Sequence, residues 1–353
     1  MRVLGIESSA DETAAAVVKD GKKLLSSVIA SSMDKHVAYG GMVPEIAARS
    51  HLEVIIPVID DALKQAKCSW DDVDAIAVTN GPGLNGSLLI GVLTARTLAI
   101  TKNKPLYEIN HVEAHVYANF LTETDLPGYN LPAKQPDFPL LALIVSGGHS
   151  QLVLFKKHFF YNVLGQTADD AVGEAFDKVA KILGLPYPGG PSVEKAAAEG
   201  NPNAIKLPIA KMENTYDFSF SGLKTAVLRA AQELAGKDYT FPSGKLPKAL
   251  TAKQKNDIAA SFCQTAVQTL VDKLQLAIKE FKPKSVVIAG GVAASRTLRQ
   301  AIEEQIKQPV LYPDFKLCTD NAAMIATLGY YKATSDTLTS DPYSLETQPS
   351  LAM

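Results

Sequence analysis

The order of structural elements repeats along the chain, and this repeat constrains the fold more than any single motif. Apolar runs, turn signals and helical periodicities follow one another as strand, polar loop, strand, turn, strand, helix, strand, glycine loop, helix, strand and helix. One series begins at Arg2 and the second at Leu140. Residues 122–139 between them are rich in proline and polar side chains, which predicts a linker. The repeat lies in element order, not in residue identity.

Two copies of such a unit indicate an α/β protein with two tandem ribonuclease-H-like lobes that face a cleft, the architecture of actin-like ATPases and sugar kinases. A chain of 353 residues also exceeds the usual size of one hydrophobic core. We therefore expect residues 1–132 to form the first lobe and residues 133–332 the second. The second lobe would carry a helical insertion near residues 191–256, and residues 333–353 could pack on the first lobe.

Composition excludes several classes of protein. No apolar run approaches the roughly 20 residues of a membrane span, and Glu7 interrupts the N-terminal apolar run too early for a signal peptide. The three cysteines are widely spaced, which is not a disulfide framework. A net charge of −2 argues against bulk electrostatic binding of nucleic acid, although not against a local basic patch. We expect a cytoplasmic protein without membrane contact.

A pair of histidines follows the strand predicted over residues 105–109, within the run Asn110-His111-Val112-Glu113-Ala114-His115. Residues four apart share one face of a helix, so both imidazoles can reach one transition-metal ion. Glu113 points away from that face, and the run therefore lacks the general base of the metalloprotease pattern H-E-x-x-H. The alternative is two polar residues on a partly hydrated helix.

A third ligand is suggested by the repeat. His111 and His115 open the last helix of the first half, and Asp320 opens the corresponding helix of the second half. Pseudo-symmetry would bring the two helix starts together across the cleft as a His-His-Asp site with open positions for substrate. Asp320 or Thr319 could instead cap the helix.

Three glycine loops at strand or helix ends favour nucleotide binding, because glycine lets backbone amides approach a phosphate closely. They are Ser146-Gly147-Gly148-His149, residues 188–192 and Gly290-Gly291. Asp11 and Glu12 lie in the first hairpin loop, where actin-like folds direct side chains at phosphates. Taken singly, each of these segments is also compatible with an ordinary turn.

The chain resembles the TsaD (formerly Gcp) family, the tRNA N6-adenosine threonylcarbamoyltransferases of bacterial type. The resemblance covers nearly all of residues 1–332 and rests on many motifs in the same order. They are Gly5-Ile6-Glu7-Ser8-Ser9, Asp11-Glu12-Thr13, Asn80-Gly81-Pro82-Gly83, the histidine run, Val145-Ser146-Gly147-Gly148-His149, Gly173-Glu174-Ala175-Phe176-Asp177-Lys178, Tyr187-Pro188-Gly189-Gly190-Pro191, Phe218-Ser219-Phe220-Ser221-Gly222-Leu223-Lys224 and Cys318-Thr319-Asp320-Asn321.

This resemblance implies transfer of a threonylcarbamoyl group from threonylcarbamoyl-AMP to N6 of the adenosine 3′ to the anticodon of tRNA (position 37). It implies iron or zinc bound by His111, His115 and Asp320, with magnesium able to accompany the nucleotide. The residues implied to contact substrate are Val145, Ser146, Gly147, Gly148, His149, Asp177, Gly190, Glu194 and Ser295. Asp11 and Glu12 are candidates for taking the amine proton. A TsaB homologue and the ATPase TsaE are the implied partners.

Two positions depart from the family pattern. Ala10 stands where relatives often have cysteine, which excludes a thiol role there. Ser295 replaces an asparagine that contacts the nucleotide in many relatives, and its hydroxyl offers fewer hydrogen-bonding groups. The competing hypotheses are an actin-like kinase or ATPase, which would not need the paired histidines, a metalloprotease, which would need a glutamate on their face, and a non-catalytic scaffold, which would need neither.

Overall fold

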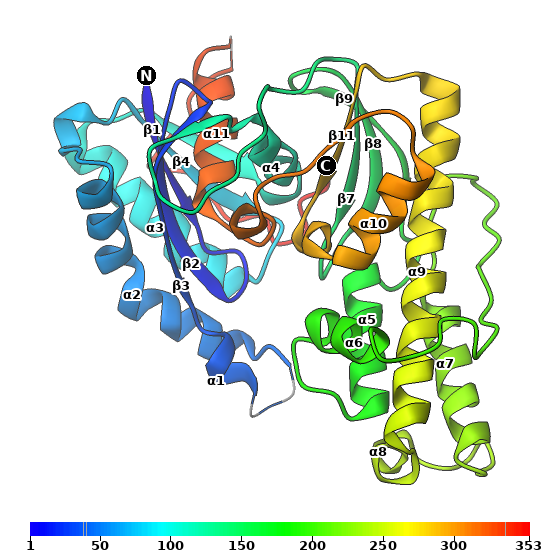
Figure 1. Cartoon of the computed structure of the whole chain (residues 1–353). Coiled ribbons are helices and arrows are strands. Elements are labelled where there is room, and N and C mark those ends of the chain that lie inside the picture. The colour runs from blue at the N-terminus through cyan, green and yellow to red at the C-terminus, as the bar shows by residue number, and fades with distance from the viewer. Residues whose placement is uncertain (38, 40, 336) are drawn as a thin grey trace. The chain divides into compact units, whose positions relative to one another are not determined.

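The computed structural model describes residues 1–353 except 38, 40 and 336 (Figure 1). Contacts within the chain divide it into two compact units. The first unit comprises Met1–Pro136 and Leu311–Met353, and the second comprises Asp137–Val310. Residues 311–332 thus belong with the first unit, whereas the repeat in the sequence had assigned them to the second lobe.

The sheet of the first unit has the strand order β5-β4-β1-β2-β3-β6. Its strands are β1 (Arg2–Glu7), β2 (Glu12–Lys19), β3 (Lys23–Ser31), β4 (Ala75–Gly81), β5 (Leu106–Asn110) and β6 (Glu123–Thr124). β1, β2 and β3 form an antiparallel meander, while β4 pairs parallel to both β1 and β5. β1 and β4 are almost entirely buried, which explains why their sequences read as continuous apolar runs.

The sheet of the second unit repeats this order as β11-β10-β7-β8-β9. Its strands are β7 (Leu140–Val145), β8 (Ser150–Lys157), β9 (Phe160–Gln166), β10 (Ser285–Ala289) and β11 (Val310–Leu311). β7, β8 and β9 are antiparallel, and β10 runs parallel to β7. The internal repeat expected from element order is therefore confirmed strand by strand.

Helices occupy the intervals between the strands. Those of the first unit are α1 (Met33–Val37), α2 (Pro44–Gln65), α3 (Asn85–Lys102), α4 (His111–Tyr117) and α11 (Ala322–Ala333), and those of the second are α5 (Val172–Leu183), α6 (Gly189–Ala197), α7 (Ser221–Leu234), α8 (Leu246–Ala249), α9 (Ala252–Phe281) and α10 (Arg296–Gln305). Short 3₁₀ helices lie at Trp70–Asp72, Ala118–Phe120, Ser243–Lys245, Gly291–Ala294 and Phe315–Leu317. None of the helices in the described part of the chain could cross a membrane.

Helix α11 covers the sheet of the first unit, although it follows the last strand of the second sheet (Figure 1). It packs on β1, β2 and β4, and every residue from Ala322 to Gly329 is buried. A helix that is apolar on all sides needs such a fully enclosed position. Glycines permit the close approach: a Cβ on Gly5 would lie 2.2 Å from the carbonyl oxygen of Ala322, and one on Gly329 would lie 2.4 Å from the Cβ of Ala77.

Residues 340–353, which we call the C-terminal strap, contact β5 and the end of β4. The amide of Ser340 donates to the carbonyl oxygen of Leu106 at 2.8 Å, and that of Gln348 donates to the carbonyl oxygen of Asn80 at 2.6 Å. Arg96 donates hydrogen bonds to the carbonyl oxygens of Pro342 and Tyr343, each at 2.6 Å. Near the other end of the strap, the side-chain amide of Asn110 donates to the carbonyl oxygen of Ala352 at 3.1 Å. The strap therefore contacts the residue that precedes the histidine helix.

Candidate metal centre and glycine loops

The two histidines lie on one face of α4, as their spacing predicted. Asn110 ends β5 and caps the helix, because its side-chain oxygen accepts hydrogen bonds from the amides of Val112 at 2.9 Å and Glu113 at 3.1 Å. The exposed fractions of His111 and His115 are 7% and 1%, and their ring centroids are 4.7 Å apart. Both imidazoles are therefore buried side by side, and the partly hydrated alternative is wrong.

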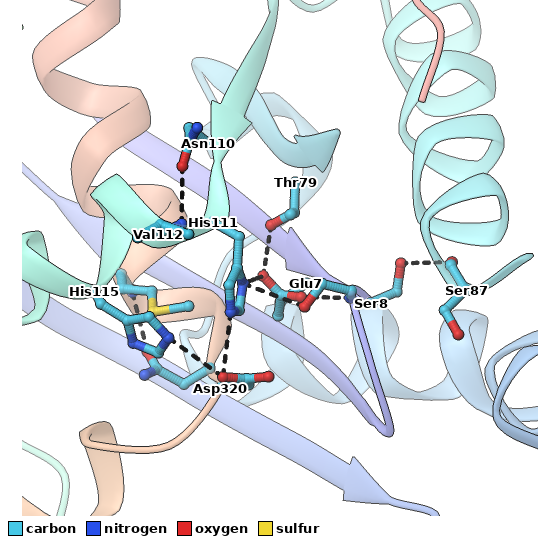
Figure 2. A network of polar contacts seen from close by, with 12 residues as sticks. Glu7, Ser8, Thr79, Ser87, Asn110, His111, Val112, His115 and Asp320 are labelled. Carbon is cyan, nitrogen blue, oxygen red and sulfur yellow. Dashed lines mark hydrogen bonds and ion pairs between the residues drawn. The ribbon is translucent and has the colours of Figure 1, made fainter. Parts of the chain in front are cut away.

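Asp320 is the third member of the group. Its Oδ1 atom lies 3.4 Å from Nε2 of each histidine, and one ligand atom from each of the three residues falls within 4.8 Å of the others (Figure 2). The helix cap is Asn321, whose side chain accepts from the amide of Met324 at 3.0 Å. The carboxylate of Asp320 is thus directed at the histidines, and neither Asp320 nor Thr319 is the cap.

The route by which Asp320 reaches the histidines differs from the one expected. All three residues belong to the first unit, so the group does not form across a cleft between two repeats. The reason is the packing of α11, which lies on β1, β2 and β4 and beside α4. Asp320 immediately precedes α11 and is carried to α4 with it.

A second layer of polar contacts holds His111 in position (Figure 2). Glu7, at the end of β1, has no exposed surface, and its Oε2 atom lies 3.0 Å from Nδ1 of His111. The same carboxylate accepts from the hydroxyl of Thr79 and the amide of Ser9, both at 2.5 Å. Nδ1 is thereby engaged and Nε2 is left to face Asp320. A carboxylate behind a histidine in this way is the usual support of a metal-bound imidazole.

The charges within this buried group stabilise one another. Burial alone would lower the pKa of His111, but the charges of Asp320 and Glu7 raise this pKa well above its ordinary value. Burial opposes ionisation of Glu7 and Asp320, yet the charge of His111 holds the pKa of both carboxyls below the ordinary range. Burial lowers the pKa of His115, which favours its neutral form.

These residues fit a divalent transition metal. Within the described residues, neither ring nitrogen of the buried His115 has a hydrogen-bond partner. Leaving such polar atoms unpaired is costly, and coordination of an ion would satisfy one of them. Two imidazoles and one carboxylate are a donor set suited to zinc or iron and leave coordination positions open. The three residues therefore form a possible metal site.

The remaining acidic candidates of the first unit differ in their surroundings. Burial raises the pKa of Glu113 to about 7, and the opposing charge on it is that of Lys332, not of a histidine. Burial, a hydrogen bond with Asp11 and the charge of Asp320 raise the pKa of Glu12 to about 10. Glu12 is therefore protonated near neutral pH.

In the second unit, the loop after β7 holds its backbone open. The amide of Ser146 donates to the carbonyl oxygen of His149 at 2.8 Å, and the amide of His149 donates to the hydroxyl of Ser146 at 3.1 Å. A Cβ added to Gly147 or Gly148 would meet no atom within 4 Å. These two glycines are thus not required by packing within the described chain. The loop follows directly after Val145, the last residue of β7.

A second open position follows at the start of α6. Asp177 on α5 accepts from the amide of Gly189 at 2.7 Å, and burial raises the pKa of its carboxyl. A Cβ on Gly189 would collide with the backbone of Asp177, whereas one on Gly190 would meet nothing within 4 Å. Gly189 is therefore explained by packing and Gly190 is not.

Ser295 and Glu194 contact each other. The hydroxyl of Ser295 donates to Glu194 and accepts from the amide of Leu298 at 3.0 Å, so that it caps α10. The amide of Thr297 also donates to Glu194, at 3.3 Å. Ser295 thus uses most of its hydrogen-bonding capacity within the protein, on Glu194 and on the first turn of α10.

The sequence did not single out Glu7 and Thr79 as parts of the site. The signal available was a carboxylate directly after the apolar run of residues 3–6, at a buried strand end where an ionised side chain is stable only when it is paired. Similarly, Gly290 has a φ of 90°, and a Cβ there would lie 2.4 Å from the carbonyl oxygen of Val145. Gly290 is thus needed for the packing of the loop, whatever else it binds.

Comparisons with known proteins identify a family that matches most of the chain. The family model for TsaD, described as tRNA N6-adenosine threonylcarbamoyltransferase, matches residues 23–327. A protein of that name from Thermomicrobium roseum is 50% identical over 340 residues, covering 94% of this chain and 92% of the relative. Another from Bacillus subtilis is 47% identical over 334 residues, covering 93% of this chain and 90% of the relative.

Solved structures of much lower identity share the fold. Full-length HypF superimposes with a TM-score of 0.57 at 14% identity, over 95% of this chain and 56% of that one. Component A of (R)-2-hydroxyglutaryl-CoA dehydratase from Acidaminococcus fermentans gives 0.50 at 17% identity, over 95% and 100%. The actin-like α/β architecture expected from the repeat is confirmed.

Proposed function

The chain belongs to the TsaD family of tRNA N6-adenosine threonylcarbamoyltransferases, and from this premise we propose that it transfers the threonylcarbamoyl group of threonylcarbamoyl-AMP to adenosine 37 of tRNA. In this reaction N6 of the adenosine forms a bond to the carbamoyl carbon. The bond from that carbon to a phosphate oxygen of AMP breaks, and N6 loses a proton. The observation that carries the proposal is the convergence of His111, His115 and Asp320, supported by Glu7.

We propose that His111 and His115 bind iron or zinc through their Nε2 atoms and that Asp320 supplies a carboxylate oxygen. When bound, such an ion would polarise the carbonyl of the carbamoyl group. Glu7 would hold Nδ1 of His111 and so fix the direction of Nε2, while burial of His115 favours the neutral imidazole that coordination needs. Elemental analysis of the purified protein would decide between iron and zinc.

The adenylate would be bound by the loops of the second unit. Gly147 and Gly148 allow the close approach of a phosphate to backbone amides, and Gly190 does the same at the start of α6. The further contacts proposed for the substrate are Val145, Ser146, His149, Asp177, Glu194 and Ser295. Because Ser295 already donates to Glu194, this pair would act on the nucleotide as one unit. Magnesium could accompany the phosphates.

The proton released by N6 requires a base, and Asp11 and Glu12 were the candidates. Glu12, with a pKa of about 10, already carries a proton near neutral pH. We therefore assign the base to Asp11 and give Glu12 the role of donating a hydrogen bond to it. The metalloprotease alternative is not supported, because Glu113 has Lys332 as its charged neighbour. A kinase would leave the histidine pair unexplained.

The partners follow from the family. We expect the enzyme to act on tRNA together with a TsaB homologue and the ATPase TsaE, in the cytoplasm. The net charge of −2 is consistent with a protein that shares the binding of tRNA with other chains.

One experiment tests the reaction and the metal together. Purified protein is given threonylcarbamoyl-AMP, partner proteins and unmodified tRNA, and nucleosides are then analysed by mass spectrometry. The wild type should form threonylcarbamoyladenosine, and the His111→Ala/His115→Ala variant should form at least ~100-fold less and contain no stoichiometric metal. His158→Ala serves as the matched control. Equal product from the double variant would remove the metal from the mechanism, and no product from metal-loaded wild type would reject the transferase.

A further inference from the structure

One segment of the second unit has a charge opposite to that of the whole chain. Residues 229–255, which we call the basic tip, contain six basic and two acidic residues, whereas the complete protein has a net charge of −2. The basic residues are Arg229, Lys237, Lys245, Lys248, Lys253 and Lys255. The tip runs from the last turns of α7 through α8 to the first turn of α9. It lies at the end where α7 and α9, which pack against each other, are connected (Figure 1).

The tip is anchored on the helices that carry it. Gln232 on α7 is buried, and its side-chain amide donates to the carbonyl oxygens of Tyr239 at 3.2 Å and Phe241 at 2.9 Å. Gln254 on α9 donates to the carbonyl oxygen of Leu234 at 2.8 Å. The loop between the two helices is thus held at both sides. A surface that is already ordered loses little entropy when it binds.

Aromatic rings alternate with the charges on this segment. Tyr239 is 69% exposed, and the guanidinium of Arg229 lies over its ring, 5.8 Å from the centroid. The ammonium group of Lys237 lies over the ring of Phe241 at 5.4 Å. An exposed tyrosine flanked by cations offers a face on which an unpaired base can stack.

The cations of the tip are mostly free of acidic partners. Among the described residues, Lys253 forms a salt bridge with Asp257, while Arg229, Lys237, Lys245 and Lys248 form none. All four are exposed. Unpaired exposed cations beside an aromatic ring match a polyanion with bases, because phosphates pair with the cations and bases with the ring. An acidic protein surface would not explain the ring.

We infer that the basic tip is a tRNA-binding surface, an inference that rests on the proposed function and assigns part of its macromolecular substrate to a defined segment. Lys237, Lys245 and Lys248 contact phosphates, and Tyr239 stacks on an unpaired base. The tip supplies locally the positive charge that the chain as a whole lacks.

The test compares two triple variants of the full-length chain. Lys237→Gln/Lys245→Gln/Lys248→Gln removes charge from the tip, and Lys279→Gln/Lys284→Gln/Lys307→Gln removes the same charge from exposed lysines near the opposite end of α9. A helix of 30 residues is about 45 Å long, so the two sets lie far apart. Equilibrium binding of unmodified tRNA is measured by fluorescence anisotropy over a range of salt concentrations.

The tip variant should bind tRNA at least ~10-fold more weakly, and the slope of log affinity against log salt should fall by roughly 2 to 3, about one for each phosphate contact removed. The control should stay within about twofold of wild type. Tyr239→Ala should weaken binding at least ~5-fold, while Tyr239→Phe, which keeps the ring, should restore it.

Two results would overturn the inference. One is equal tRNA affinity and salt slope in the tip variant and the control, and the other is preferential binding of the tip to vesicles of anionic lipid over tRNA. Failure of the proposed function has a different signature, namely wild-type protein that binds tRNA through the tip but forms no threonylcarbamoyladenosine in the complete reaction.

Discussion

The two sheets share the same order of five strands, but the loops at the ends of their strands carry opposite chemistry. In the first unit, β1 ends in the buried carboxylate of Glu7, and β5 leads directly into the histidine helix. In the second unit, β7 leads into a loop with two glycines at which an added Cβ would meet no atom within 4 Å. The first unit buries ionisable side chains at these strand ends, and the second unit has glycine backbone without side chains there.

Under the proposed function, this difference would let one architecture serve two ligands. Buried imidazoles and carboxylates fix a cation, because an unpaired charge in the interior is costly. Open glycines suit an anion, because they leave amides free to approach it. Four changes follow in order of expected effect: the first two test this division directly, and the last two test the stability of the units that carry it.

Gly5→Ala should separate α11 from the first sheet. The new Cβ would lie 2.2 Å from the backbone oxygen of Ala322, which cannot move without moving the helix. We expect a loss of about 1–3 kcal/mol in the free energy of unfolding and weaker metal binding, because Asp320 precedes that helix. Urea unfolding and elemental analysis measure the two effects. Gly244→Ala, where a Cβ meets nothing within 4 Å, is the control, and equal behaviour of the two variants would refute the packing argument.

Gly147→Val should abolish adenylate binding in the second unit and leave the metal in the first. The position has room for a side chain within the protein, so the fold should persist, while the added methyl groups occupy the space through which a phosphate would approach. We expect a loss of affinity of at least ~10-fold for a non-hydrolysable adenylate analogue, measured by calorimetry, at unchanged metal content. Wild-type affinity in this variant would mean that the loop has been misassigned.

Arg96→Ala should loosen the C-terminal strap. The guanidinium donates to the carbonyl oxygens of Pro342, Tyr343 and Leu345, and hydrogen bonds from a charged group are worth about 1.5–3 kcal/mol when they are buried and less when they are partly exposed. We expect faster cleavage of residues 340–353 in limited proteolysis and a loss of about 1 kcal/mol in the free energy of unfolding. Arg96→Lys should restore little, since it cannot donate three bonds in a plane. Unchanged proteolysis would show that the strap is held without Arg96.

Substitution of His158 should have the smallest effect, and this effect should appear in how the free energy of unfolding depends on pH. Burial lowers its pKa to about 4 from the ordinary 6.5, so the unfolded chain binds a proton in this window and the folded chain does not. His158 therefore lowers the free energy of unfolding as the pH falls from 6.5 to 4. Because the ring is partly exposed, the effect should be at most about 1 kcal/mol. His158→Gln should be less acid-sensitive than wild type, and an NMR titration midpoint near 6.5 for His158 would contradict the prediction.

The sequence predicted the repeat and the pair of histidines well, because both depend on local periodicity. Alternation of apolar residues and the spacing of His111 and His115 are both set within a few residues. The convergence of Asp320 with the histidines was also anticipated, although by a symmetry argument that placed it between two lobes.

The sheet on which α11 packs could not be predicted from local periodicity. Element order does not state which sheet a helix will cover, and this depends on surfaces far apart in the sequence. The signal that existed was the composition of the helix, which is apolar all round and therefore requires enclosure, together with Gly5 and Gly329 at the points of closest approach. The protonation of Glu7 and Glu12 could likewise not be predicted from the sequence, because burial and neighbouring charges determine the pKa of each carboxyl.

The packing of α11 on the first sheet also has a consequence for biosynthesis. The ribosome makes His111 and His115 about 200 residues before Asp320, which at ~5–20 residues per second is roughly 10 to 40 s. Throughout that interval the first sheet has no helix on the face that α11 will cover, and His111 and His115 lack Asp320 beside them. Meanwhile Asp137–Val310 is completed and can fold as a unit. We therefore expect the later part of the chain to mature first, and a nascent chain stalled at residue 310 to hold metal far more weakly than the released protein. Equal metal retention by the stalled and released chains would show that the site does not wait for Asp320.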